Sequence, residues 1–290
     1  MRLAIAASKD HLVLPFPEKV ELTRSIIERT LEVAKRPAVA FSGGYHSCIM
    51  LREVLKADPG ILVYLVNLKL AMPDYDNIVR KFAEENSLNL WRVDTYSWAD
   101  ADEFMSRGIV FRGLQHVPYG RWEELRINQS CRRVRRRVEG HFLRAQGVDY
   151  VFTGVLAGDE TSRMAWWLRD GYVKGRDRKQ MGQGQYQVKP IAHWTEEDCN
   201  EECRRGKVPH PNFPYDYYGE QRQGEFGCFM CTVRIREEDG GNLGCLYRND
   251  KELWNKVMYQ HDGAAILRNI QDAFPKPWLA RFIKEYLKGD

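Results

Sequence analysis

The sequence lacks the features that would place it in a membrane or outside the cell. No apolar run approaches the roughly 18 residues that a membrane-spanning helix needs, and residues 1–10 (MRLAIAASKD) contain no apolar segment typical of a secretion signal. Internal repeats and low-complexity segments are absent as well. We therefore expect a cytoplasmic protein with no membrane partner. Its 290 residues, 43% of them apolar, are enough to bury a substantial core.

Cysteine is scarce, with seven residues and no accompanying secretion signal, so metal ligands or nucleophiles are expected rather than disulfides. A C-x-x-C pair can be a redox dithiol, half of a zinc site or half of an iron–sulfur site. Four thiolates could converge on one metal site, and spacing alone does not separate zinc from a four-iron cluster. These candidate ligands are Cys131, Cys228, Cys231 and Cys245. The other three suit small buried apolar positions better: Cys48, Cys199 and Cys203.

The net charge is only +4, but the basic residues are unevenly spread. Eight arginines fall within one short stretch: Arg121, Arg126, Arg132, Arg133, Arg135, Arg136, Arg137 and Arg144. Guanidinium groups match phosphate oxygens in two-point geometry, so this density favours phosphate binding. The alternative is a solvated helix face. Glu139 is the only acid in residues 127–147, which favours the phosphate interpretation.

Short apolar runs alternate with segments of helical spacing, which indicates an open, mostly parallel α/β sheet. The pattern predicts strands at 38–41, 61–67, 88–93, 149–153 and 186–191. It predicts helices at 18–35, 47–56, 74–87 and 123–146. The composition changes after Gly171, with a polar loop at 174–185 and then short helices, prolines and cysteines. We expect an α/β domain at 1–193 and a smaller region at 194–290.

The stretch FSGGYHSCIML, residues 41–51, joins the first predicted strand to the next helix through two glycines. In such sheets ligands bind beyond the carboxyl ends of the strands. A glycine turn that enters a helix presents unpaired backbone N–H groups to an anion. Ser42, Gly43, Gly44 and Ser47 fit that arrangement. A tight structural connection without a ligand is the alternative.

This stretch resembles the PP-loop, SGGxDS, of the ATP pyrophosphatases and of the phosphoadenylylsulfate (PAPS) reductase family. Three further stretches resemble the second group in the same order: 153–164 (TGVLAGDETSRM), 188–199 (VKPIAHWTEEDC) and 227–232 (GCFMCT). Together they span about residues 37 to 235. The resemblance implies a five-stranded parallel sheet of the adenine nucleotide alpha-hydrolase type.

The resemblance also implies roles for particular residues. The loop residues Ser42, Gly43, Gly44 and Ser47 would hold the phosphates of ATP, bound with Mg²⁺. Gly154 and Arg163 would close the site. His46 stands where the motif has aspartate, so a fixed negative charge is lost and the arrangement of metal and pyrophosphate is expected to differ. His46 and Arg163 are the candidate catalytic residues.

Family members with metal at the corresponding cysteines carry a [4Fe-4S] cluster, so the resemblance favours iron–sulfur over zinc at the four candidate cysteines. The family's reductases need a nucleophilic cysteine near the C-terminus, in a segment like ECGLH. This chain has no cysteine after Cys245. A reductase of that mechanism is therefore not the expected activity.

Residues 224–233 (GEFGCFMCTV) resemble a segment of the DndC-type proteins of bacterial DNA phosphorothioation, and the chain length suits an SspD-type relative. That resemblance implies an ATP-dependent sulfurtransferase that inserts sulfur into nucleic acid, with DNA as the expected substrate and a cysteine desulfurase as sulfur donor. Two alternatives stay open: a PAPS or adenylylsulfate reductase that uses a thiol from elsewhere, and a non-catalytic module that binds nucleotide or nucleic acid.

Overall fold

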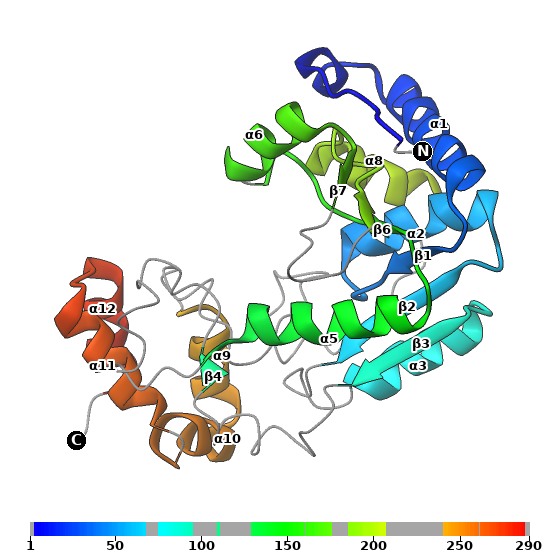
Figure 1. The fold of residues 1–290 in the computed structure, drawn as a ribbon. Helices are drawn as coiled ribbons and strands as arrows, with labels where there is room; N and C mark the ends of the chain where they lie inside the picture. Colours follow the sequence, from blue (N-terminus) through cyan, green and yellow to red (C-terminus); the bar gives the residue numbers. More distant parts are fainter. Residues whose placement is uncertain are drawn as a thin grey trace. The chain divides into compact units, whose positions relative to one another are not determined.

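The computed structural model describes residues 3–67, 75–94, 109–110, 129–159, 161–175, 185–206, 240–260 and 262–287. The chain, drawn as a ribbon in Figure 1, divides into two compact units. The first comprises Met1–Val66, Asp76–Val93 and Arg137–Asn212, and the second comprises Asn67–Tyr75, Asp94–Arg136 and Phe213–Asp290. The domain boundary expected between residues 193 and 194 stays a prediction.

A six-stranded sheet in the order β3-β2-β1-β6-β8-β7 organises the first unit. Its strands are β1 (Pro37–Ala40), β2 (Leu62–Asn67), β3 (Leu90–Asp94), β6 (Tyr150–Thr153), β7 (Val173–Gly175) and β8 (Tyr186–Val188). The strand β1 pairs in parallel with β2 and β6, and β6 pairs in parallel with β8. The α/β class and the mostly parallel sheet are therefore confirmed. The expected five strands become six because β7 adds an antiparallel edge to β8.

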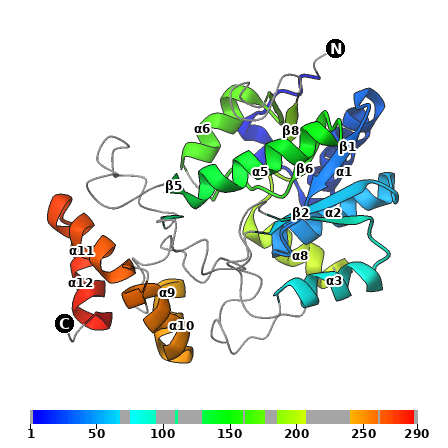
Figure 2. The same ribbon diagram turned by 60° about the horizontal axis from the view of Figure 1, so that its bottom comes forward.

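The helices of this unit lie on the two faces of the sheet, because side chains alternate along each strand. On one face Ala38, Tyr64 and Val151 pack with Phe142 and Leu143 of α5 (Cys131–Ala145). Figure 2 shows α5 lying across the strands. The Tyr64 hydroxyl is buried there and donates a 2.6 Å hydrogen bond to the carboxylate of Glu139.

The other face carries Val39, Val63 and Phe152, each fully buried. Here α2 (Tyr45–Ala57) contacts β6 and packs against α1 (Phe16–Val33) and α8 (Glu196–Gly206). The buried Trp194 indole donates a 2.9 Å hydrogen bond to the hydroxyl of Thr23, which ties the entry of α8 to α1. Both faces are covered, which explains the continuous apolar runs of the strands.

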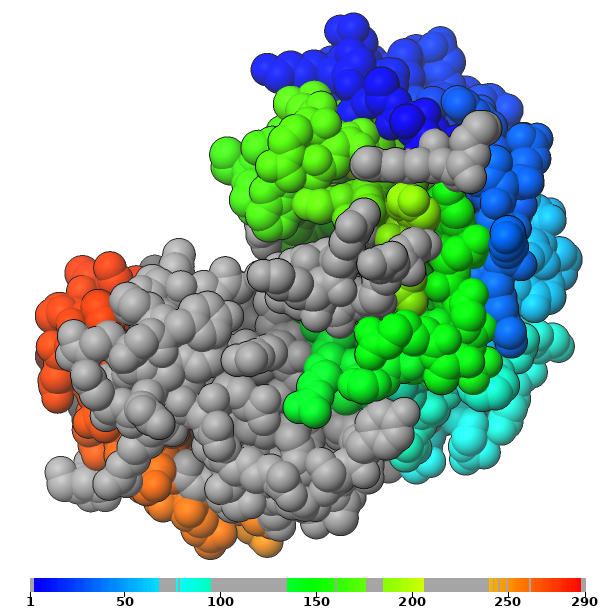
Figure 3. Space-filling model, viewed as in Figure 1, coloured from blue at the N-terminus to red at the C-terminus, as the bar shows by residue number. Residues whose placement is uncertain are grey.

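The N-terminal segment and α6 (Thr161–Asp170) complete the first unit, and they adjoin each other in the space-filling view of Figure 3. The Tyr172 amide donates a 3.0 Å hydrogen bond to the carbonyl of Ile5. Helix α6 was not among the expected helices. The helix α3 (Tyr75–Glu85) is confirmed. The expected helix 123–146 is shorter, since α5 begins at Cys131 after the short strand β5 (Gln129–Ser130).

Among the described residues, the second unit contains the parallel pair β4 (Ile109–Val110) and β5, and several helices with one π-helical turn. The helices are α9 (Gly241–Asn249), α10 (Lys251–Asn255), α11 (Gly263–Ala273) and α12 (Pro277–Tyr286), and the turn is Lys256–Gln260. Helix α12 is amphipathic and buries Leu279, Phe282 and Tyr286. In the part of the chain that the structure describes, no helix has the length and apolar character to span a membrane.

Candidate functional site

The turn between β1 and α2 is built around Gly43. This residue has φ +71°, a backbone conformation that L side chains rarely adopt, so glycine is required there. The Ser47 hydroxyl donates a 2.6 Å hydrogen bond to the carbonyl of Gly44. The Ser42 hydroxyl lies 3.1 Å from the Ser47 hydroxyl. The two serines predicted at this loop therefore fix its shape, with Gly44 as the residue that precedes the helix.

The N-terminus of α2 has the features of a helix end that binds anions. Gly44 occupies the capping position, and no side chain caps the helix there. The first-turn N–H groups and the helix dipole together favour a bound anion at such an end. The loop also lies at the carboxyl edge of the parallel sheet, where ligands of such sheets bind. The sequence-predicted loop residues are thus brought together in a geometry that suits phosphate.

Gly154 brings the segment after β6 against the start of α2. A Cβ atom at this position would lie 2.5 Å from the carbonyl oxygen of His46 and 2.8 Å from Cα of Ser47. Real Cβ atoms essentially never approach that closely. Only glycine allows the two backbones to touch. Gly154 therefore sets the distance between the turn of residues 41–44 and the loop that carries Asp159.

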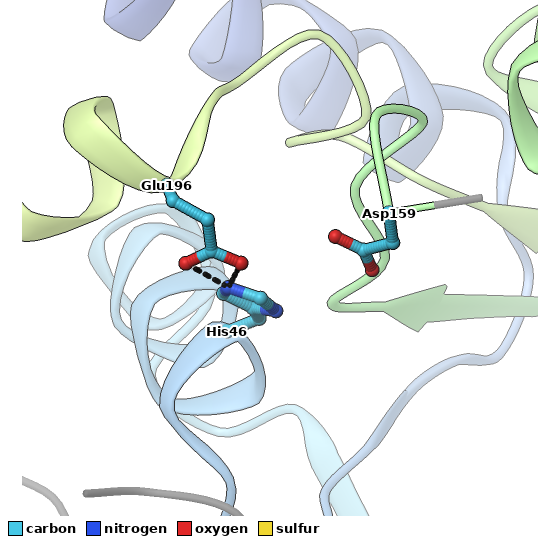
Figure 4. Close-up of side chains that lie close together, drawn as sticks. All are labelled: His46, Asp159 and Glu196. Carbon is cyan, nitrogen blue, oxygen red and sulfur yellow. Dashed lines mark hydrogen bonds and ion pairs between the residues drawn. The ribbon is translucent and has the colours of Figure 1, made fainter. Parts of the chain in front are cut away.

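Side chains from three elements meet beside the turn, as Figure 4 shows. His46 Nε2 lies 3.0 Å from Oε1 and 3.1 Å from Oε2 of Glu196, the first residue of α8. Asp159, from the loop between β6 and α6, offers a third ligand atom, and all three ligand atoms lie within 4.8 Å of one another. His46 is partly buried, whereas the two acids are exposed. Arg163 in α6 forms an ion pair with Asp159.

Glu196 is held in place by the start of its helix. Thr195 and Asp198 cap each other: the Thr195 amide donates to Asp198 Oδ2 at 2.7 Å, and the Asp198 amide donates to the Thr195 hydroxyl at 3.2 Å. Asp198 also pairs with the buried ammonium of Lys19 at 2.6 Å. Burial raises the pKa of Asp198, but hydrogen bonds from Lys19 and Thr195 outweigh it and lower the pKa overall.

Tyr45 fastens α2 to α8 on the same side of the turn. Its hydroxyl donates to the backbone carbonyl of Cys199 at 2.9 Å and lies 3.0 Å from Oδ1 of Asn200. Burial and the neighbouring thiol of Cys203 raise the pKa of Tyr45. The hydroxyl therefore stays protonated and acts as a structural donor between the two helices that carry His46 and Glu196.

The cysteines expected to be structural lie along this helix pair. Cys48 and Cys199 are buried, and Cys203 is partly buried. Burial raises the pKa of Cys48 to about 12, and burial with the carboxylate of Glu196 raises the pKa of Cys199. Thiols that stay protonated are poor nucleophiles and poor ligands. For Cys48 and Cys199, this supports the expectation that they occupy small buried apolar positions.

The side chains of the four predicted cluster ligands lie outside the part of the chain that the structure describes. Cys131 begins α5 and Cys245 lies in α9, but their side chains are outside the described set. Cys228 and Cys231 lie wholly outside the described residues. The four-cysteine site stays a prediction.

A cavity of about 360 Å³ lies elsewhere, lined by residues that include Lys35, Asp58, Ile61 and Trp91. These residues adjoin the amino ends of β1, β2 and β3. Ligands of parallel sheets bind at the opposite, carboxyl edge. The turn at residues 41–47 is therefore the better candidate site.

Sequence reasoning missed Glu196 and Asp159 as site residues. The signal for Glu196 was present as a Thr-x-x-Asp capping box, TEED at residues 195–198, which places Glu196 in the first turn of a helix. What the sequence did not reveal was that this helix end faces His46, 150 positions away. Asp159 sits in an irregular loop whose path depends on tertiary contacts, among them the close approach at Gly154 and the hydrogen bond from the Ala157 amide to the Ala192 carbonyl.

Fold and site together define an α/β protein with an open helix N-terminus at the carboxyl edge of a parallel sheet. The model of the phosphoadenosine phosphosulfate reductase domain matches residues 36–234, well over half of the chain. The chain belongs to that family.

Solved structures with a similar fold include PAPS reductase from Candida auris in a phosphate complex, at 13% identity and TM-score 0.46, covering 72% of this chain and 92% of that chain. The U34-tRNA thiolase NcsA from Methanococcus maripaludis, with its [4Fe-4S] cluster, matches at 13% identity and TM-score 0.47 over 86% of this chain and 80% of that one. Candida glabrata FMN adenylyltransferase with FAD and inorganic pyrophosphate matches at 13% identity and TM-score 0.47 over 74% and 63%. No curated protein matches the sequence.

Proposed function

We propose that this chain is an ATP-dependent sulfurtransferase that splits ATP to AMP and pyrophosphate and inserts sulfur into nucleic acid, with the DNA backbone as substrate. The observation that carries the proposal is the turn at residues 41–47, where a left-handed Gly43 leads into an uncapped α2. Family membership over residues 36–234 and the resemblance of residues 224–233 to DndC-type proteins support the same chemistry.

In the proposed first step, a phosphate oxygen of the nucleic acid attacks the α-phosphorus of ATP. A phosphorus–oxygen bond to adenylate forms, and pyrophosphate leaves. The open N–H groups of α2 and the hydroxyls of Ser42 and Ser47 would bind the phosphates of the nucleotide, and Arg163 would offset developing negative charge. Positioning and charge stabilisation are the main contributions of a protein to phosphoryl chemistry.

In the second step, sulfide attacks the activated phosphorus and AMP leaves with the former phosphate oxygen, so the product is a phosphorothioate and no net oxidation is needed. A cysteine desulfurase would supply the sulfur as a persulfide, and a thiol reductant would provide the two electrons that release it as sulfide. Cys131, Cys228, Cys231 and Cys245 would form a four-thiolate ligand set of the kind that holds a [4Fe-4S] cluster, with zinc as the alternative metal. When bound, the cluster would provide sulfur or electron-transfer chemistry.

A sulfonucleotide reductase is the second candidate, favoured by the family description itself. It would use a thiol from elsewhere. Sulfite release from PAPS or adenylylsulfate in the presence of thioredoxin distinguishes it from the first. A non-catalytic module would bind ATP or DNA and convert neither.

The test is pyrophosphate release from ATP in the presence of DNA, measured for the wild type and for a Ser42→Ala, Gly44→Ala double variant. We expect the double variant to release no pyrophosphate, because the loop that would bind the phosphates of ATP is altered. Gly158→Ala is the matched control, since a Cβ there meets no atom within 4 Å. Unchanged release in the double variant would refute the proposal.

A separate measurement addresses the sulfur chemistry. Anaerobic purification followed by iron and sulfide analysis should give about four of each per chain, with loss in Cys228→Ala. Zinc or no metal at these cysteines would leave nucleotide binding intact and remove the basis for sulfur insertion.

A further inference from the structure

His46, Asp159 and Glu196 come from three different elements, namely α2, the loop after β6 and the first residue of α8. Figure 4 shows the two carboxylates on either side of the imidazole. The same turn positions the proposed nucleotide phosphates, so the three side chains lie where a cation accompanying those phosphates would be held.

We propose that these three side chains form a divalent-cation site that prefers Mn²⁺ and related transition metals over Mg²⁺. The inference rests on the proposed function for its role, because the bound cation would contact the nucleotide phosphates. The site itself belongs to the free protein and can be measured without nucleotide.

The separations in the structure fit one shared ion. Two neighbouring ligands of an octahedral ion at about 2.1 Å are about 3 Å apart, and opposite ligands are about 4.2 Å apart. His46 Nε2 and Glu196 Oε1 are 3.0 Å apart, which matches the neighbouring arrangement. All three ligand atoms lie within 4.8 Å of one another. The longest separation would therefore have to shorten by up to about 0.6 Å to reach the distance between opposite ligands.

The kinds of ligand atom determine the metal preference. Mg²⁺ is held mainly by oxygen ligands, whereas imidazole nitrogen suits first-row transition metals such as Mn²⁺, Co²⁺ and Zn²⁺. Residue 46 is an aspartate in the motif that this loop resembles, and the histidine exchanges one oxygen ligand for nitrogen. The other two ligands are carboxylate oxygens, which are hard ligands that also suit Mn²⁺. The identity of residue 46 thus sets the metal preference of the site.

The competing arrangement is two ion pairs with no metal. In that state a protonated His46 pairs with Glu196, and Arg163 pairs with Asp159. Metal binding would need a neutral His46 and an Asp159 carboxylate shared with Arg163. If the three side chains bind a metal, loss of one carboxylate weakens metal binding. If they form only the two ion pairs, the same loss leaves metal binding unchanged, so an experiment can separate the two states.

The experiment titrates Mn²⁺ into nucleotide-free, full-length protein, with free Mn²⁺ followed by electron paramagnetic resonance and Mg²⁺ added as competitor. We expect the wild type to bind Mn²⁺ at least tenfold more tightly than Mg²⁺. Glu196→Gln should weaken Mn²⁺ binding by about tenfold or more. Glu197→Gln, an exposed neighbour on the same helix, is the matched control and should bind normally.

His46→Asp supplies the converse test, because it restores an all-oxygen set and should reverse the preference toward Mg²⁺. Equal Mn²⁺ affinity in the wild type, Glu196→Gln and His46→Asp would overturn the inference and leave the two ion pairs as the correct description. The outcome is independent of ATP turnover. If pyrophosphate release depends on Ser42 but the protein has no Mn²⁺ site, only this inference fails. If the protein has a Mn²⁺ site but does not turn over ATP, only the proposed function fails.

Discussion

Gly154→Ala is the substitution that most directly tests how the site is assembled. The new Cβ would lie 2.5 Å from the His46 carbonyl oxygen, and ordinary contact begins at 3.4 Å, so the two backbones must separate by about 0.9 Å. The obstructing atoms are backbone and cannot rotate aside. Overpacking of this kind typically destabilises by about 1–3 kcal/mol. We expect the melting temperature to fall by about 2–10 °C.

The functional effect should exceed the loss of stability. Separation of the two backbones moves the loop that carries Asp159 away from His46, so affinity for Mn²⁺ and for ATP should fall at temperatures where the variant is fully folded. Thermal unfolding by circular dichroism, with metal and nucleotide titrations at 20 °C, measures both effects. Gly158→Ala, in the same loop but with open space around the new Cβ, should match the wild type. A Gly154→Ala protein with unchanged melting temperature and affinity would refute the steric argument.

Two further predictions follow from buried titratable groups. Burial lowers the pKa of His193 to about 4, below the ordinary 6.5, so the folded protein keeps it neutral; stability should be full above about pH 6.5 and fall by up to about 3 kcal/mol toward pH 4. Urea midpoints across that range should show a smaller pH dependence in His193→Gln than in the wild type, and an equal slope would contradict the assignment. Because burial raises the pKa values of Cys48 and Cys199, iodoacetamide at pH 8 should label neither in the folded protein and both in urea. Rapid labelling of the folded protein, read by mass spectrometry, would show that they are accessible thiolates.

The central strands were predictable because their environment is uniform. Val39, Val63 and Phe152 lie in the middle of a sheet covered on both faces, so each strand reads as a continuous apolar run. Helix α6 escaped prediction because its sequence, TSRMAWWLRD, buries only Trp167 among its residues. A single buried position does not show the repeated spacing of apolar residues by which a helix is predicted. Strand β7 has three residues and depends on pairing with β8, which is a tertiary contact.

The loop at residues 41–47 was predictable for a different reason, since left-handed glycine and short hydroxyl side chains are local requirements of the turn itself. Its partners were not predictable in the same way. Glu196 reaches His46 only because α8 is held against α1 by the Lys19–Asp198 pair and against α2 by Tyr45, contacts that join segments more than 150 residues apart.

The position of Glu196 and Asp159 beside His46 indicates a role for this histidine that the motif alone does not show. Taken by itself, the change from aspartate to histidine removes a negative charge from a site expected to hold a cation with nucleotide phosphates. In the folded protein, Glu196 places a carboxylate 3.0 Å from His46 Nε2, and Asp159 adds a second one nearby. In the proposed metal site, these two carboxylates would supply the negative charge, and α2 would contribute a nitrogen ligand in place of the oxygen of the motif. The proposed metal site requires this pairing of His46 with two carboxylates, and the Mn²⁺ titration distinguishes that site from a silent binding module.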